Sequence, residues 1–164
     1  MTMHRNGKTK GFTLIEMMVT IGLVAFLLTL GVPLAREWVQ SAHQRDAANI
    51  LNEALGRAKA LALRNPQGLT DQTLPAAAVC LIGGKLSVVS AGTKNTACGA
   101  NIEWTKPLSS DASVVLTTTN IPFQCVAYNE RGVALVTSVS NLSCTQAWLD
   151  VNVGSEETLN VQLP

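Results

Sequence analysis

Four cysteines are the residues of this sequence best suited to covalent or metal chemistry, at positions Cys80, Cys98, Cys125 and Cys144. None belongs to a CxxC pair, and the two histidines, His4 and His43, lie far from them in sequence. Because a zinc site needs clustered thiolate or imidazole ligands, this spacing argues against a bound metal, and no cofactor is expected. An even number of cysteines downstream of an export-like apolar segment instead predicts two disulfides, formed in an oxidising compartment.

The remaining polar residues give little support for catalysis. A nucleophilic serine or cysteine needs a base beside it. The only histidine after the first ten residues is His43, which lies on the exposed half of a predicted helix, and the acids Glu103, Asp111 and Glu130 are scattered along the chain. The sequence therefore predicts a protein that is not an enzyme.

One carboxylate, Glu16, directly precedes an uncharged and mostly apolar run from Met17 to Ala35. About 20 such residues span a bilayer, and a carboxylate at the centre of a membrane helix costs roughly 2.5–3.5 kcal/mol. The basic residues before the run place residues 1–10 in the cytoplasm by the positive-inside rule; they are Arg5, Lys8 and Lys10. A cleavable secretory signal fits poorly, because the run is long and lacks an A-x-A-like site. Neither that signal nor a simple anchor explains Glu16.

The stretch from Gly11 to Glu16, GFTLIE, follows a short basic leader and precedes the apolar run. It resembles the type IV prepilin signal. In that family a membrane prepilin peptidase cuts after the glycine and methylates the new terminal residue. The resemblance therefore implies cleavage between Gly11 and Phe12 and N-methylation of Phe12. Pro33 also matches a position where many pilins carry proline.

The resemblance further implies a partner for Glu16. Phe12 and Glu16 are four residues apart, so on a helix they would share one face. Cleavage would expose a positive amine at Phe12. The amine of a neighbouring subunit could then neutralise Glu16 in a low-dielectric setting, where an unpaired charge is costly.

We expect one helix from Phe12 to Arg64, about 80 Å long at 1.5 Å per residue. Its first half is apolar on all sides, and Pro33 is a predicted helix break, either a kink or a local loss of helicity inside a filament. Asn65-Pro66 should end the helix, because proline disfavours helical geometry at the preceding residue. The second half is amphipathic, with apolar residues at spacings of three and four, namely Val39, Ala42, Leu51, Ala54, Leu55, Ala58, Leu61 and Ala62.

Beyond the helix the sequence changes to short β-like runs separated by turn residues. The predicted strands are Ala77–Ile82, Lys85–Ser90, Ala100–Thr105, Ser113–Thr119, Phe123–Tyr128, Val133–Thr137, Ala147–Val153 and Thr158–Leu163. Gly83-Gly84 predicts a tight hairpin between the first two. The expected fold is α+β, with a long N-terminal helix on an antiparallel sheet, as in a type IV pilin-like fold. Four cysteines permit three connectivities; we favour Cys80–Cys98 and Cys125–Cys144, since each pair brackets a predicted hairpin.

These features predict four regions. Residues 1–11 form a leader that prepilin peptidase removes, and residues 12–35 form a transmembrane half-helix that later enters a filament core. Residues 36–66 form the amphipathic half, and residues 67–164 form a β-rich head in the periplasm or outside the cell. Without residues 1–11 the chain keeps nine basic and eleven acidic side chains, a formal charge of −2. That balance gives no support for nucleic-acid binding.

The helix end Leu55–Asn65, the strand that carries Cys80 and the turn Asn129–Gly132 resemble the FimT/FimU/GspH type of minor pilin. The resemblance implies a low-abundance subunit that helps prime or cap a type IV pilus. A pseudopilin of a type II secretion system is the alternative. A DNA-binding competence pilin is less favoured, because some FimT-type receptors carry a Gly-Arg-x-Arg element near the C-terminus, whereas this chain has no basic residue after Arg131.

The same resemblance implies a set of partners and a location. The partners would be prepilin peptidase, other minor and major pilins, an inner-membrane assembly platform and, before assembly, the lipid bilayer. The chain would cross the bacterial inner membrane once, with its N-terminus in the cytoplasm. It would then enter a pilus or pseudopilus.

Overall fold

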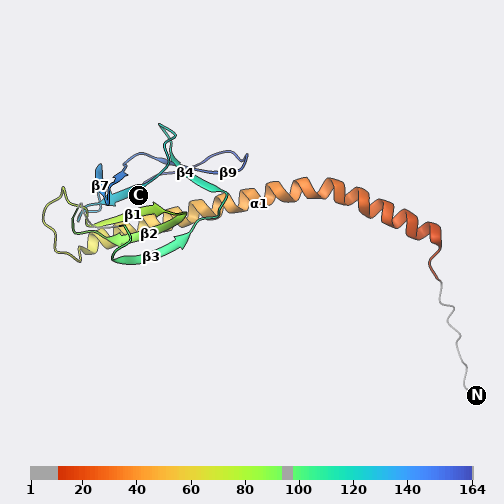
Figure 1. Ribbon diagram of the computed structural model, residues 1–164, viewed down its shortest axis with the longest axis horizontal. Helices are drawn as coiled ribbons and strands as arrows, with labels where there is room; N and C mark the ends of the chain where they lie inside the picture. Colours follow the sequence, from red (N-terminus) through yellow and green to blue (C-terminus); the bar gives the residue numbers. More distant parts are fainter. Residues whose placement is uncertain (1–10, 94–97, 164) are drawn as a thin grey trace, which may run out of the picture. The chain divides into compact units, whose positions relative to one another are not determined.

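The protein consists of a long helix followed by a β-rich region (Figure 1). The computed structural model describes residues 11–93 and 98–163, without the side chains of residues 30 and 32–35. Helix α1 spans Leu14–Arg64. The strands in the described residues are β1 (Ala77–Ile82), β2 (Lys85–Ser90), β3 (Ile102–Pro107), β4 (Ala112–Leu116), β5 (Cys125–Tyr128), β6 (Ala134–Leu135), β7 (Thr137–Val139), β8 (Leu142–Cys144), β9 (Leu149–Val153) and β10 (Leu159–Val161). The predicted α+β class is confirmed, and the fold is consistent with that of a pilin.

Helix α1 ends where the sequence predicted, at Arg64. Asn65 takes the left-handed conformation that commonly follows a helix, with φ of 47°. Its side chain accepts a hydrogen bond from Leu69 N at 2.8 Å and donates one to Leu69 O at 2.7 Å, which fixes the exit of the chain. The helix continues through Pro33, so a loss of helicity at this position inside a filament stays a prediction. Among the described residues, no helical segment combines the length and the apolar character that a membrane span requires.

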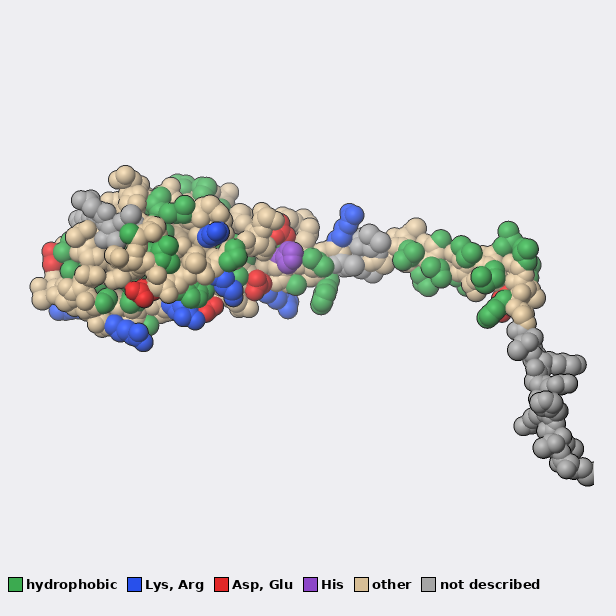
Figure 2. Space-filling view, turned by 60° about the horizontal axis from the view of Figure 1, so that its bottom comes forward, with side chains coloured by type: hydrophobic (Ala, Val, Ile, Leu, Met, Phe, Trp, Pro, Cys, Tyr) green, Lys and Arg blue, Asp and Glu red, His purple; other side chains and the backbone are tan. Residues whose placement is uncertain are grey.

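The chain divides into two compact units, residues 1–38 and residues 39–164. In the first unit, the large apolar side chains from Phe12 to Leu28 are 52–79% exposed. Figure 2 shows them as green side chains along this part of the helix. A helix that is apolar on all sides cannot bury these side chains alone, and it needs lipid or other helices around it.

In the second unit, two sheets are formed. The larger has the order β3-β2-β1-β5-β8-β7, with β6 also paired to β5, and the smaller has the order β10-β9-β4. Strands β1 and β2 have the predicted bounds, and Gly83 and Gly84 between them have φ of 56° and 72°. Both values suit the two-residue hairpin that this Gly-Gly pair predicted.

The expectation of a wholly antiparallel sheet is wrong at one position. Strand β8 lies parallel to β5, with Cys144 opposite Cys125. The reason is a second tight hairpin, because Ser140 and Asn141 have φ of 51° and 64° and turn β7 back into β8. Ser-Asn is a weaker hairpin signal than Asn-Gly or Gly-Gly, and strand β8 was therefore missed from the sequence.

The larger sheet is covered on both faces. On one face, residues such as Ala77 and Val79 pack with the buried side of α1 and with strands of the smaller sheet. On the other, Ala78 joins a second cluster that contains all four cysteines. The disulfides are Cys80–Cys98 and Cys125–Cys144, the connectivity favoured from the predicted hairpins.

The buried side of α1 begins at a polar residue. Val39 is 44% exposed and Ala42 is also exposed, so the predicted apolar stripe starts too early. Gln44 is 4% exposed, and its Nε2 donates to Val151 O at 3.0 Å and to Glu157 O at 2.6 Å. This amide joins α1 to strand β9 and to the loop before β10. Sequence periodicity did not identify it, because a single glutamine on a helix is usually solvated.

We expect a Gln44→Leu variant to lose roughly 1–3 kcal/mol of unfolding free energy. The substitution keeps the apolar volume but leaves two backbone carbonyl oxygens without their donor. Urea denaturation of the full chain in detergent measures the loss. The matched control is Asn52→Leu, an exposed position on the same helix. Equal midpoints for the two variants would show that the Gln44 hydrogen bonds do not stabilise the fold.

Candidate functional site

The peptide bond between Gly11 and Phe12 lies outside the secondary structure. Gly11 and Phe12 both precede α1, and the Phe12 side chain is 79% exposed. A Cβ atom added to Gly11 would meet nothing within 4 Å. The described part of the fold therefore leaves room for a larger side chain at position 11.

Thr13 and Glu16 form a capping box at the start of α1. Thr13 Oγ1 accepts a hydrogen bond from Glu16 N at 3.3 Å, and Glu16 Oε2 accepts one from Thr13 N at 3.5 Å. Each side chain thus satisfies a backbone donor that the first helical turn leaves free. A threonine three residues before a glutamate, both ahead of an apolar run, is the sequence signature of a capping box. This motif was not among the predictions from the sequence.

The capping box changes the expected geometry of Phe12. The sequence-based argument placed Phe12 and Glu16 on one face of a helix, but α1 begins at Leu14, so Phe12 precedes it. Thr13 takes the capping position, where the backbone is no longer helical. The Glu16 carboxylate is exposed and can accept further hydrogen bonds beyond the one from Thr13 N. Its pairing with a neighbour's amine stays a prediction.

In a comparison with protein families, residues 6–32 match the prokaryotic N-terminal methylation motif. The chain carries a type IV prepilin signal. Residues 6–10 of the match, like most of the predicted leader, lie outside the described residues, and the rest covers the Gly11–Phe12 bond and the capping box. No curated protein and no solved structure matches the chain.

The prepilin signal supports a type IV pilin-like protein that is anchored in the membrane. It implies processing by a prepilin peptidase and assembly with other pilins. Pilin-like families are generally structural rather than enzymatic.

The structure brings together two residues that the sequence left apart. His43 Nδ1 lies 3.0 Å from Asp111 Oδ2, and both side chains are about half exposed. The hydrogen bond from His43 is the main cause that lowers the pKa of Asp111. Ser109 also interacts with the Asp111 carboxylate. The Asp111 carboxylate therefore lies between the Ser109 hydroxyl and the His43 imidazole. In a catalytic triad the imidazole lies in the middle, where it can take the proton of the serine. The arrangement of these three residues is different.

The other acids considered from the sequence lie elsewhere. Glu130 pairs with Arg131 at 3.6 Å, and Glu103 is exposed on β3. In the part of the chain that the structure describes, no group of three or more histidine, cysteine or acidic side chains could hold a metal ion.

Two features of the minor-pilin resemblance lie against each other in the second unit. In the turn Asn129–Gly132, Gly132 has φ of 72°, and a Cβ added there would lie 3.2 Å from Lys59 Cγ and 3.3 Å from Leu63 Cδ2. Asn129 Oδ1 accepts hydrogen bonds from Arg131 N and Val133 N, which shapes the turn. The glycine thus allows this turn to approach the last turns of α1 closely.

Proposed function

We propose that this chain is a minor pilin that helps prime or cap the assembly of a type IV pilus. The observation that carries the proposal is the prepilin signal placed directly before a helix with an exposed apolar surface. The head supports the minor rather than the major class, because its two disulfides are spread over the β region. Major pilins usually carry a single disulfide loop near the C-terminus.

In this proposal the leader is a recognition element and the helix is the assembly element. Prepilin peptidase cuts after Gly11 and methylates Phe12, while residues 12–35 lie in the bacterial inner membrane. Residues 36–66 and the head at 67–164 lie outside the cytoplasm. During assembly the amine of one subunit neutralises Glu16 of another, and the apolar half-helix exchanges lipid for neighbouring helices.

The contribution of the head is docking to other subunits rather than chemistry. A helix end and a turn that pack together, as Leu63 and Gly132 do, give a rigid surface for that contact. The partners in this proposal are other minor pilins, the major pilin and the inner-membrane assembly platform.

Deletion of the gene, followed by complementation with the full chain, tests the proposal. We expect surface pili and twitching to be lost or strongly reduced and to return on complementation. Secretion of folded proteins through a type II system should be unchanged. Loss of secretion with normal pili would instead assign the chain to a pseudopilus. Loss of DNA uptake with normal piliation would favour the competence role.

A further inference from the structure

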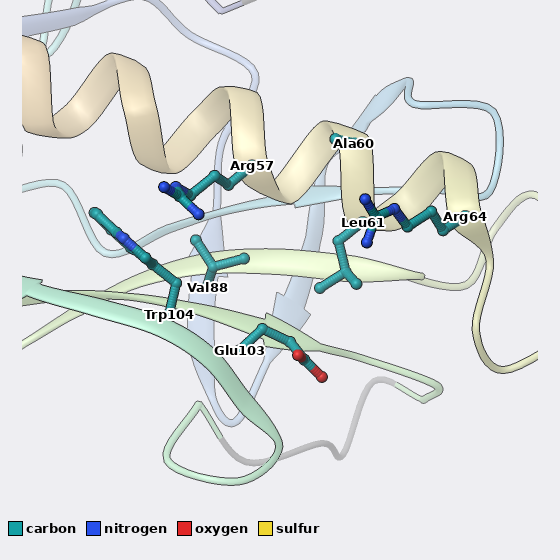
Figure 3. Close-up of a pocket in the computed structure, with 7 residues that line it drawn as sticks. All are labelled: Arg57, Ala60, Leu61, Arg64, Val88, Glu103 and Trp104. Carbon is teal, nitrogen blue, oxygen red and sulfur yellow. The ribbon is translucent and has the colours of Figure 1, made fainter.

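A groove of about 220 Å³ lies between the last turns of α1 and strands β2 and β3 (Figure 3). Leu61 from α1 and Val88 from β2 place apolar side chains between the helix and the sheet, Trp104 lies at one end, and Ala60 of α1 also lines the groove (Figure 3). Arg57 and Arg64 project from α1 along one side, and Glu103 comes from β3. Strand β3 is one of the two edge strands of the larger sheet, so the groove opens at a sheet edge.

Arg57 is held in place by its neighbours. Its Nε and Nη2 both donate to Glu53 Oε1, at 2.9 and 2.7 Å, and its guanidinium lies 5.5 Å from the centre of the Trp104 ring. Lys106 Nζ lies 3.9 Å from the other oxygen of Glu53. Glu53 is therefore already shared by two cations, and the aromatic ring adds a favourable contact to Arg57. These contacts favour the orientation of the guanidinium toward Glu53 and Trp104.

Arg64 is placed differently. Within residues 11–93 and 98–163, it has no hydrogen bond or ion pair, and it is exposed. Figure 3 shows the Glu103 carboxylate directed away from both guanidinium groups. The groove and its rim thus carry three cations, namely Arg57, Arg64 and Lys106. The acids are Glu53 and Glu103, and Arg64 is the cation that is free to bind an anion.

We propose that this groove binds an acidic peptide segment of a neighbouring pilin subunit. A carboxylate of the segment binds Arg64, the groove arginine without an acidic partner among the described residues, and an adjacent apolar side chain covers Leu61 and Val88. Guanidinium groups suit carboxylates because their planar donors can bind both oxygens. The identity of the partner as a pilin rests on the proposed function, whereas the chemistry of the groove does not.

A peptide is favoured over nucleic acid as the occupant. Phosphate binding needs several clustered basic residues, whereas Arg57 and Lys106 are already paired with Glu53, which leaves Arg64 as the groove cation for an anion, and the leader-free chain carries a net formal charge of −2. Addition of a full strand to β3 is also disfavoured, because Pro107 and Lys106 at its end are typical protections of a sheet edge. Side-chain docking into the groove is the remaining mode.

Binding of a labelled peptide to the full chain in detergent tests the proposal. The probe is fluorescein-labelled Glu-Leu-Glu-Leu amide, and the reference peptide carries Gln in place of Glu. We expect the acidic probe to bind more tightly than the reference and Arg64→Gln to weaken its binding about fivefold, as for a partly exposed charge pair. Glu103→Gln should strengthen it, because a like charge is removed. The control is Arg45→Gln, an exposed arginine of α1 outside the groove.

Several results would overturn the proposal. They are the absence of binding at millimolar peptide, equal affinity for the Gln peptide, and an equal loss with Arg45→Gln. Tighter binding of a single-stranded oligothymidine that also depends on Arg64 would assign the groove to nucleic acid instead. These outcomes do not depend on pili, so a failure here is separate from a failure of the gene deletion to abolish piliation.

Discussion

A Gly11→Ala variant is expected to accumulate with its leader still attached. Gly11 is exposed, precedes α1 and has open space where a Cβ would lie. The substitution therefore leaves the fold unchanged, and its effect falls on the enzyme that must bind the chain across the Gly11–Phe12 bond. We expect cleaved product to fall by more than about tenfold, since a methyl group placed at the scissile bond displaces the reacting atoms.

Intact-mass measurement of the purified protein decides the outcome. The wild-type chain should lack residues 1–11 and carry one added methyl group on Phe12, whereas the variant should keep its full length. Gly56→Ala is the matched control, because Gly56 is also exposed and has no atom within 4 Å of an added Cβ. Normal removal of the leader from Gly11→Ala would show that glycine is not the determinant at this bond.

Elements with strong local signals could be predicted from the sequence. The hairpin of β1 and β2 has its predicted bounds, because Gly83-Gly84 suits positive φ and the flanking runs are apolar. Helix α1 ends at Arg64 because Asn65-Pro66 cannot continue it.

Features that depend on distant partners were not predicted. The parallel pairing of β5 with β8 requires the hairpin at Ser140 and Asn141, whose residue types only weakly favour it. Gln44 is buried only because strand β9 and the loop before β10 supply carbonyl oxygens from more than 100 residues away. The groove beside β3 combines residues of α1, β2 and β3, and no spacing in the sequence indicates it.

The capping box is the exception, since its signal is local and was overlooked. Thr13 lies three residues before Glu16 and directly ahead of the apolar run, which is the sequence signature of this motif. The structure gives Glu16 a role inside its own chain, as the acceptor for Thr13 N. Two explanations for this glutamate therefore compete. Either it starts the helix, or it provides a negative charge for a neighbour's amine.

Glu16→Gln separates these two roles. Glutamine also serves at this position of a capping box, so the variant keeps the start of α1 and removes only the charge. Breaking a desolvated ion pair by removing one partner costs roughly 3–5 kcal/mol. If the charge is what a neighbouring subunit binds, we expect incorporation into filaments to fall more than about tenfold, although cleavage and methylation of the chain continue.

Thr13→Ala gives the complementary variant. It removes the capping oxygen that accepts from Glu16 N but leaves the carboxylate in place. Loss of such a cap costs about 1 kcal/mol, so we expect incorporation close to wild type. Glu37→Gln, an exposed acid on α1 beyond the apolar run, is the control for a general effect of charge. Immunoblots of sheared pili against whole-cell protein measure incorporation for each variant.

The pattern across these variants decides which role dominates. Poor incorporation of Glu16→Gln alone, with Thr13→Ala near wild type, would assign the charge to subunit pairing. Normal incorporation of Glu16→Gln with a defect in Thr13→Ala would contradict that pairing, because the cap alone would then account for the glutamate. Glu16→Gln keeps an acceptor for Thr13 N, whereas Thr13→Ala keeps the negative charge of Glu16. A loss of helix stability alone therefore cannot explain poor incorporation of Glu16→Gln beside normal incorporation of Thr13→Ala.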